Sequence, residues 1–202
     1  YLDGFVALNT CDNIRRLYDV WAHYLSTPLC YILSLPHKNS PEAIKFFHSQ
    51  LKDLKVKLEE LRGREITEEE LKNSIRLYNR VRKLQKELAE TSKNGAGLLK
   101  SSDIFMVNLT SGFIIKEKYL SLLENLLASL KKGKPSAKSD RARLLVLGSE
   151  LDNPDLFQLI ESCGGDVVVE DLCTGSKTFW NMVDERGAPL EALAKAYLLR
   201  PP

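Results

Sequence analysis

The sequence predicts an α/β fold in which two units with strands flank a helical segment. Apolar runs at residues 5–8 and 144–147 have the length of buried strands, and an amphipathic stretch typical of a helix follows each. In the later unit a second apolar run, 166–169, completes a strand–helix–strand pattern with short loops, which implies parallel pairing and a right-handed crossover. Between the two units, apolar residues recur at intervals of three and four, as on one face of a helix.

Composition limits the class of protein. A chain of 202 residues can bury a substantial core, and 44% hydrophobic with 28% charged residues is ordinary for a soluble globular protein. The net charge of +2 gives no reason to expect nucleic acid or a membrane surface as the main partner. The longest apolar runs are only as long as strands, so we expect no membrane span, and no signal peptide is visible.

Start and stop signals define the helices of the middle segment. Ser40 before a proline predicts a helix start, and Gly63 predicts where that helix ends. Thr67, with a glutamate three residues later, forms a capping-box pattern for a second helix. A third stripe of apolar residues at helical spacing covers 119–130. Each stripe is too short for a long coiled coil, so we expect antiparallel helices packed against an α/β lobe. The predicted inner face of the second helix consists of Leu71, Ile75, Tyr78, Val81, Leu84 and Leu88.

These signals divide the chain into segments joined by one polar, basic linker. A basic run of this size is usually a solvated loop, and contact with an anion or nucleotide is the alternative. The expected segments are 1–38, the end of a first α/β lobe; 39–131, mainly helical; 132–142, the linker; and 143–202, the start of a second α/β lobe.

The cysteines are the best candidates for chemistry. Cys11 lies where a predicted strand ends and a helix begins, and Cys173 lies just past the strand at 166–169. Open α/β sheets place their ligands at that edge, and a helix N-terminus favours the thiolate form. If the two lobes face each other, both thiols point into one cleft and suit an iron–sulfur site. The alternative is that both are small, buried core residues.

Other residues have structural interpretations. The four cysteines are widely spaced with no CxxC pair, which favours a reduced, cytoplasmic protein over a disulfide scaffold. Cys30 and Cys163 are expected to be packed in the core among aliphatic side chains. The three histidines are dispersed, so no joint metal site is expected from them. Neither a dinucleotide fingerprint, a P-loop nor a nucleophile elbow is present.

Several short motifs, in a fixed order along the chain, resemble those of a known family. They are Asp3-Gly4-Phe5-Val6, Thr10-Cys11-Asp12-Asn13-Ile14-Arg15-Arg16, Leu35-Pro36-His37, Gly63-Arg64-Glu65-Ile66-Thr67 with Leu71, Tyr78-Asn79-Arg80, and Glu170-Asp171-Leu172-Cys173-Thr174-Gly175. Together they resemble the subunits of 2-hydroxyacyl-CoA dehydratases and ATP-dependent benzoyl-CoA reductases, and the likeness covers essentially the whole chain.

The resemblance implies two Rossmann-like lobes with a helical segment, and an oxygen-sensitive 4Fe–4S cluster held between them by cysteines. It also implies a CoA-thioester substrate, a homologous second subunit and a separate ATP-dependent iron–sulfur activator protein that delivers single electrons. Cys11 matches the family's cluster cysteine, and Cys173 matches a position where many members have cysteine. Further ligand cysteines of the family fall outside this stretch, so a fragment of this span is expected to be inactive alone. Asp12, Asn13 and Arg15 are expected to cap the helix or stabilise the cleft.

The resulting functional prediction is an iron–sulfur subunit of a radical 2-hydroxyacyl-CoA dehydratase, which eliminates water from a CoA thioester after one-electron activation. An ATP-dependent benzoyl-CoA reductase subunit, in which the electrons enter the aromatic ring, is the nearest alternative. A double-cubane reductase of small molecules and a non-catalytic partner subunit are the others. The protein's own contribution would be to hold a cluster next to a thioester in a dry cavity.

Overall fold

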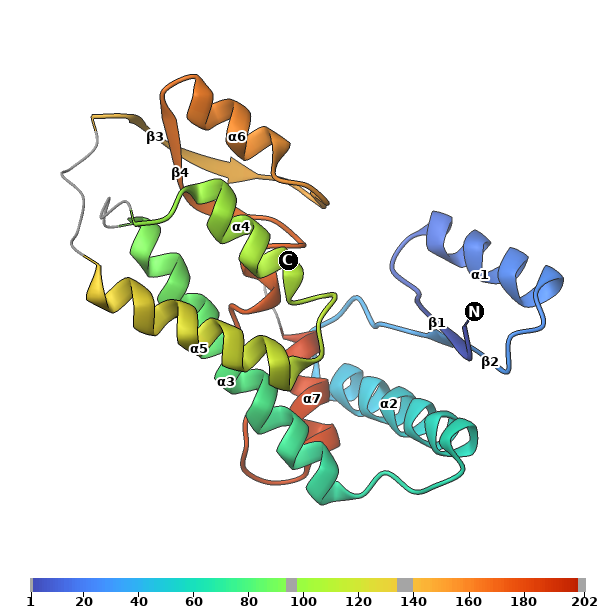
Figure 1. Ribbon diagram of the computed structural model, residues 1–202. Coiled ribbons are helices and arrows are strands. Elements are labelled where there is room, and N and C mark those ends of the chain that lie inside the picture. Colours follow the sequence, from blue (N-terminus) through green and yellow to red (C-terminus); the bar gives the residue numbers. More distant parts are fainter. Residues whose placement is uncertain (1, 94–97, 134–139, 200–202) are drawn as a thin grey trace. The chain divides into compact units, whose positions relative to one another are not determined.

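The computed structural model describes residues 2–93, 98–133 and 140–199, which form two compact units. Unit 1 consists of Tyr1–Ile75 and Val183–Pro202, and unit 2 is Arg76–Met182. Each unit has one pair of parallel strands together with helices (Figure 1), so the predicted α/β class is confirmed. None of the helices in the described part of the chain is long and apolar enough to cross a membrane.

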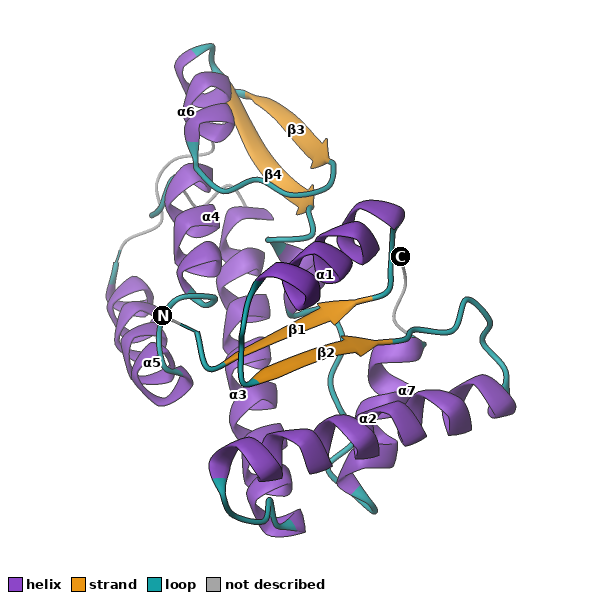
Figure 2. Ribbon diagram, turned by 90° about the vertical axis from the view of Figure 1, so that its right-hand side faces the viewer, coloured by secondary structure: helices purple, strands orange, loops and turns teal. Residues whose placement is uncertain are grey.

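In unit 1, the predicted strand and the predicted helix after it are followed by a second strand. β1 (Gly4–Leu8) and β2 (Leu29–Leu33) pair in parallel, and α1 (Asp12–Tyr24) connects them (Figure 2). The side chains of a strand alternate between the two faces of the sheet. The face that includes Phe5 meets α1, where its ring stacks on Trp21 with ring centroids 4.6 Å apart.

Two further helices of unit 1 pack together beside β2. α2 (Pro41–Arg62) packs against β2 and against α7 (Pro189–Leu198), and these three elements share one apolar core. The predicted signals of α2 are confirmed. The Ser40 hydroxyl accepts a hydrogen bond from the Ala43 N–H at 3.2 Å, and Gly63 ends the helix with φ 68°. The buried members of the core are Leu33, Ala43, Phe47, Ala194 and Leu198.

The two units differ from the predicted segments because chain neighbours are not always packing neighbours. α7 lies late in the sequence but packs on α2, so unit 1 contains both ends of the chain. The chain passes between the units twice: once inside a helix, α3 (Glu68–Lys93), between Ile75 and Arg76, and once in the loop before α7, between Met182 and Val183. Most of the predicted linker, and the break expected at 95–97, lie outside the described residues.

The start of α3 is the predicted capping box. A Glu70 carboxylate oxygen accepts from the Thr67 N–H at 2.9 Å, and the Thr67 hydroxyl oxygen accepts from the Glu70 N–H at 3.2 Å. The predicted inner face of α3 is confirmed at Ile75, Val81 and Leu88. Tyr78, however, is 42% exposed, and its neighbour Asn79 is buried instead. At the surface the Tyr78 ring contacts a cation, with the Lys116 ammonium 5.3 Å from the ring centroid.

Unit 2 has a helical layer that contains one element the sequence did not reveal. α5 (Lys116–Lys132) agrees with the third predicted stripe, whereas α4 (Ser101–Thr110) was not predicted because its apolar residues are spread around the helix. α4 is buried on more than one side, since Ile104 packs with α3 and α5 while Phe105 packs elsewhere. The core shared by these three helices consists of Val81, Leu88, Ile104, Tyr119, Leu123 and Leu127.

The predicted strand–helix–strand unit forms the rest of unit 2. β3 (Ala142–Leu147) pairs in parallel with β4 (Gly165–Asp171), and α6 (Asp155–Ser162) lies between them in the chain. β4 and α6 contribute to an apolar core in which Phe157 stacks on Phe105 at 4.6 Å between ring centroids. The expectation that β3 is buried was wrong. Its side chains are largely exposed because, within the described residues, β4 is its one strand neighbour and the helices pack mainly on β4.

Within unit 2, Glu161 of α6 links the strand–helix–strand segment to the start of α4. Its carboxylate accepts hydrogen bonds from the Ser101 hydroxyl at 2.7 Å, from the Ser102 N–H at 2.8 Å and from the Ser102 hydroxyl at 2.8 Å. Burial acts to raise the pKa of Glu161, but these hydrogen bonds, with Lys100, outweigh burial and hold the pKa below its ordinary value.

Replacing this carboxylate tests its role in stability. We expect Glu161→Gln to lower the free energy of unfolding by about 1 kcal/mol at neutral pH, because a charged acceptor is replaced by a neutral one. The folded-state pKa lies below the ordinary 4.5, so the stabilisation is present above that pH and is lost as the pH falls through the lower, folded-state value. Urea unfolding of both proteins at pH 7 and at a pH below the folded-state pKa of Glu161 measures this. A difference between the two proteins that is the same at both pH values would contradict the prediction.

Candidate functional site

Cys11 lies at the predicted junction between a strand and a helix. After β1, the Asn9 N–H donates to the Leu33 carbonyl at 2.9 Å, which extends the parallel ladder by one bond before the chain turns. Cys11 is then the N-cap residue of α1, with extended φ and ψ, and its carbonyl accepts the first helical hydrogen bond from Arg15 at 3.2 Å. Its side chain makes no capping bond and is exposed, so the alternative of a buried, packing cysteine is wrong here.

The residues after Cys11 form ordinary surface contacts of a helix start. Asp12 lies in the first turn of α1 and pairs with Arg16 at 3.7 Å, with both side chains largely exposed. Asn13 and Arg15 are exposed as well. The capping role considered for Asp12 therefore takes the form of a favourable charge in the first turn.

Cys173 lies at the corresponding edge of the sheet in unit 2, on a loop that follows β4. The Cys173 N–H donates to the Ser149 carbonyl at 2.9 Å, so this loop is bonded to the loop that follows β3. Next to it, the Thr174 hydroxyl accepts from the Leu151 N–H at 3.2 Å and donates to the Leu151 carbonyl at 2.7 Å. The backbone around Cys173 is thus held by its neighbours while the residue itself is exposed.

A half-buried carboxylate also holds this loop. Glu170, near the end of β4, accepts from the Leu172 N–H at 3.0 Å and from the Ser176 N–H at 2.6 Å, one bond on each carboxylate oxygen. The Ser176 hydroxyl donates in turn to the Glu170 carbonyl at 2.7 Å. We call this arrangement of Glu170, Leu172 and Ser176 the Glu170 clamp. Burial raises the pKa of Glu170 above its ordinary value, although the two N–H bonds act in the other direction.

Glycine at position 175 makes room for this carboxylate. A Cβ added to Gly175 would lie 2.2 Å from a Glu170 carboxylate oxygen and 2.5 Å from its carboxyl carbon. Such distances are far shorter than van der Waals contact, so a side chain at position 175 would displace the carboxylate. The Glu170 clamp therefore depends on Gly175 as well as on Glu170.

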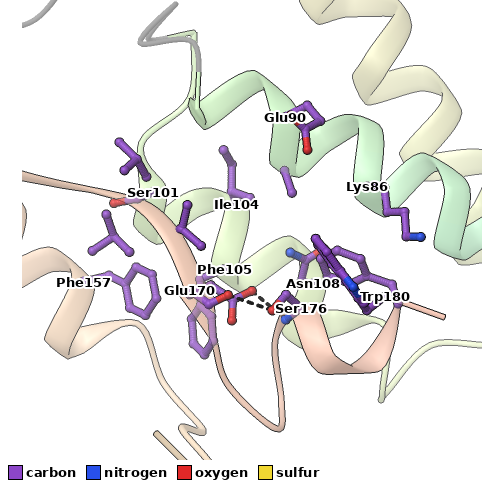
Figure 3. Close-up of a pocket in the computed structure, with 15 residues that line it drawn as sticks. Lys86, Glu90, Ser101, Ile104, Phe105, Asn108, Phe157, Glu170, Ser176 and Trp180 are labelled. Atoms are coloured by element: carbon purple, nitrogen blue, oxygen red, sulfur yellow. Dashed lines mark hydrogen bonds between the residues drawn. The ribbon is translucent and has the colours of Figure 1, made fainter. Parts of the chain in front are cut away.

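Beneath the loop, Glu170 and Ser176 line a cavity of about 160 Å³ within unit 2 (Figure 3). Its wall includes consecutive residues of β4 because the strand register shifts by one residue opposite Leu144 and Leu145, a β-bulge at Val168. At one side the Lys86 ammonium lies 5.6 Å from the centroid of the Trp180 ring. The other lining residues are Ala89, Glu90, Ser101, Ile104, Phe105, Asn108, Phe157, Val167, Val169 and Phe179.

The two remaining cysteines differ from the expectation of a buried core position. Cys163 is exposed, which corrects that prediction: it is the C-cap residue of α6, beyond the apolar face that Phe157 buries. Cys30 is half-buried in β2 on the face toward α1. There it contacts Tyr18, and burial followed by the Cys30 thiol raises the pKa of the Tyr18 hydroxyl.

The donor set fits part of an iron–sulfur site rather than a complete one. Unit 1 contains Cys11 and Cys30, and unit 2 contains Cys163 and Cys173. A 4Fe–4S cluster is held by cysteine thiolates, commonly four of them. In the part of the chain that the structure describes, no three His, Cys, Asp or Glu side chains group as metal ligands would. Exposed thiols at two strand edges are suitable ligands, and the presentation of Cys11 and Cys173 to one cavity stays a prediction.

Sequence comparison places the chain in a family. Residues 1–202 match the family described as "2-hydroxyglutaryl-CoA dehydratase, D-component", so the chain belongs to that family. It is 26% identical over 202 residues to a benzoyl-CoA reductase subunit of Thauera aromatica, a match that covers 98% of this chain and 52% of that protein. It is 24% identical over 188 residues to lactoyl-CoA dehydratase subunit beta of Anaerotignum propionicum, with 93% and 50% covered.

A third relative is also a dehydratase subunit. Subunit beta of (R)-2-hydroxyglutaryl-CoA dehydratase from Acidaminococcus fermentans is 22% identical over 180 residues, which is 88% of this chain and 47% of that protein. The chain thus spans about half the length of the curated relatives it matches. The resemblance to dehydratase and benzoyl-CoA reductase subunits is confirmed.

Thiol exposure gives a direct test of the site geometry. We expect Cys11, Cys163 and Cys173 to react with iodoacetamide under native, anaerobic, cluster-free conditions, because all three are exposed, and Cys30 to react most slowly. Mass spectrometry of peptides after timed alkylation measures each rate, and unfolding in urea should make the four rates similar. If Cys30 reacts as fast as Cys11 in the native protein, the described packing of β2 against α1 is wrong.

Proposed function

We propose that the protein containing this chain is an iron–sulfur subunit of a radical 2-hydroxyacyl-CoA dehydratase, with Cys11 and Cys173 among its cluster ligands. The main support is the family match over all 202 residues, which includes the motifs around both cysteines. The exposure of both thiols just past the carboxyl ends of parallel strands agrees with this role. The further ligands would come from parts of the protein outside this stretch.

The chain's own residues would hold and orient the thiols. Cys11 is fixed by the turn between β1 and α1, and Cys173 by the hydrogen bonds that its loop makes to the loop after β3. When bound, the cluster would supply one-electron transfer to a CoA thioester held near it. We further propose that the two strand–helix–strand units belong to Rossmann-like lobes and that the protein is cytoplasmic.

The proposal also includes partners. The names of relatives describe subunits, such as subunit beta of lactoyl-CoA dehydratase, which supports a homologous second subunit here. A CoA-thioester substrate and an ATP-dependent iron–sulfur activator protein follow from the same proposal.

A benzoyl-CoA reductase subunit is the second candidate. The match to the Thauera aromatica reductase protein covers 98% of the chain at 26% identity, comparable with the matches to dehydratase subunits. The two candidates differ in the fate of the electron rather than in the cluster. Assays of the full-length protein with its second subunit and an activator, comparing 2-hydroxyacyl-CoA with benzoyl-CoA, would separate them.

Substitution of single cysteines tests the ligand assignment. After anaerobic reconstitution of the full-length protein with iron and sulfide, we expect Cys11→Ser and Cys173→Ser each to lose most of the broad visible absorbance, because serine is a poor ligand for iron in such clusters. Cys30→Ser and Cys163→Ser serve as matched controls and should keep the absorbance of the unsubstituted protein. A colourless unsubstituted protein would contradict the proposal, as would full colour in Cys11→Ser.

A further inference from the structure

The loop that contains Cys173 is closed by a side chain outside it. Glu170 contacts the loop at both ends, at the N–H groups of Leu172 and Ser176, so that Cys173, Thr174 and Gly175 lie between two bonds to one carboxylate. The Ser176 hydroxyl adds a third bond to the backbone of Glu170. A carboxylate that bridges two amides four residues apart fixes the spacing of the loop ends, because both bonds must be satisfied by one planar group.

Forming the Glu170 clamp requires an unfavourable desolvation and a glycine at position 175, which argues against an incidental contact. Glu170 is half-buried, and withdrawing a carboxylate from water is unfavourable unless hydrogen bonds satisfy it. Position 175 must lack a side chain for the carboxylate to fit, since a Cβ would come within 2.2 Å of it. Both requirements serve the conformation of the short loop in which Cys173 stands.

We propose that Glu170, together with Gly175, positions Cys173 for its ligand role. This inference rests on the proposed function, in which Cys173 is a cluster ligand. Glu170 acts through the loop backbone and not by contact with the cluster, so it is a positioning residue. Outer groups that orient a metal ligand typically change metal affinity by about 10-fold or more when they are removed.

The direct test measures how firmly the reconstituted cluster is held. In the full-length protein we expect Glu170→Ala and Gly175→Ala each to lose visible absorbance about 10-fold faster than the unsubstituted protein when a ferrous chelator is added. Glu170→Gln keeps one acceptor oxygen and should fall between. The matched control is Glu161→Gln, which replaces a carboxylate with comparable bonds in the same unit that contacts Ser101 and Ser102 of α4 rather than the Cys173 loop.

Hydrogen exchange in the cluster-free protein gives a second readout. Peptides that cover residues 171–177 should exchange faster in Glu170→Ala and Gly175→Ala, because the Leu172 and Ser176 amides lose their acceptor. The same peptides should be unchanged in Glu161→Gln. Equal exchange in all variants would overturn the clamp itself.

A double variant tests whether glycine acts through the carboxylate. In a Glu170→Ala background the atoms that would clash with a Cβ at position 175 are gone. We therefore expect Glu170→Ala combined with Gly175→Ala to lose cluster more slowly than the product of the two single effects predicts. If the double variant loses cluster at the rate given by the product of the two single effects, the joint role of the two residues is overturned.

The failure of this inference can be told apart from failure of the proposed function. If Cys173→Ser keeps a full and stable cluster, Cys173 is no ligand and the proposed function fails at that residue. If Cys173→Ser loses the cluster while Glu170→Ala and Gly175→Ala hold it as firmly as Glu161→Gln, the ligand assignment stands and the positioning role is overturned.

Discussion

Parallel pairing of strands is the constraint on which the site depends. In each unit the two strands run in the same direction, so their carboxyl ends meet at one edge, and the chain must leave that edge through a loop. Cys11 stands in the loop after β1, and Cys173 in the loop after β4. Because the ladders fix where the strands end, they also determine at which edge each thiol lies, and the local hydrogen bonds then fix the conformation of each loop.

Local signals in the sequence were sufficient for much of the fold. Ser40, Gly63 and the Thr67 capping box marked helix boundaries that the structure confirms, because caps act through hydrogen bonds between residues a few positions apart. The parallel pair in unit 2 was also predictable, from a helix joined by short loops to two apolar runs. The position of Cys11 followed from the same local reasoning, since a strand end and a helix start are both readable from the sequence.

Features set by packing between distant segments could not be predicted in the same way. α4 has no single apolar stripe, because separate neighbours cover different sides of it. β3 was expected to be buried from its composition, but composition does not say how many neighbours a strand has. The role of Glu170 was missed for a related reason. An acidic residue at a strand end looks solvated in the sequence, and only the fold shows its two oxygens turned onto the loop.

The missing side chain at Gly175 has an evolutionary consequence. Since its absence is what leaves space for the carboxylate of Glu170, the two positions form one unit of steric fit, five residues apart in the chain. A side chain at position 175 fits only if the side chain at position 170 is shorter, and the two bonds of the clamp are then lost. Related proteins that have a bulkier residue at the glycine position should therefore have a shorter residue at the glutamate position, a correlated pair detectable in aligned sequences.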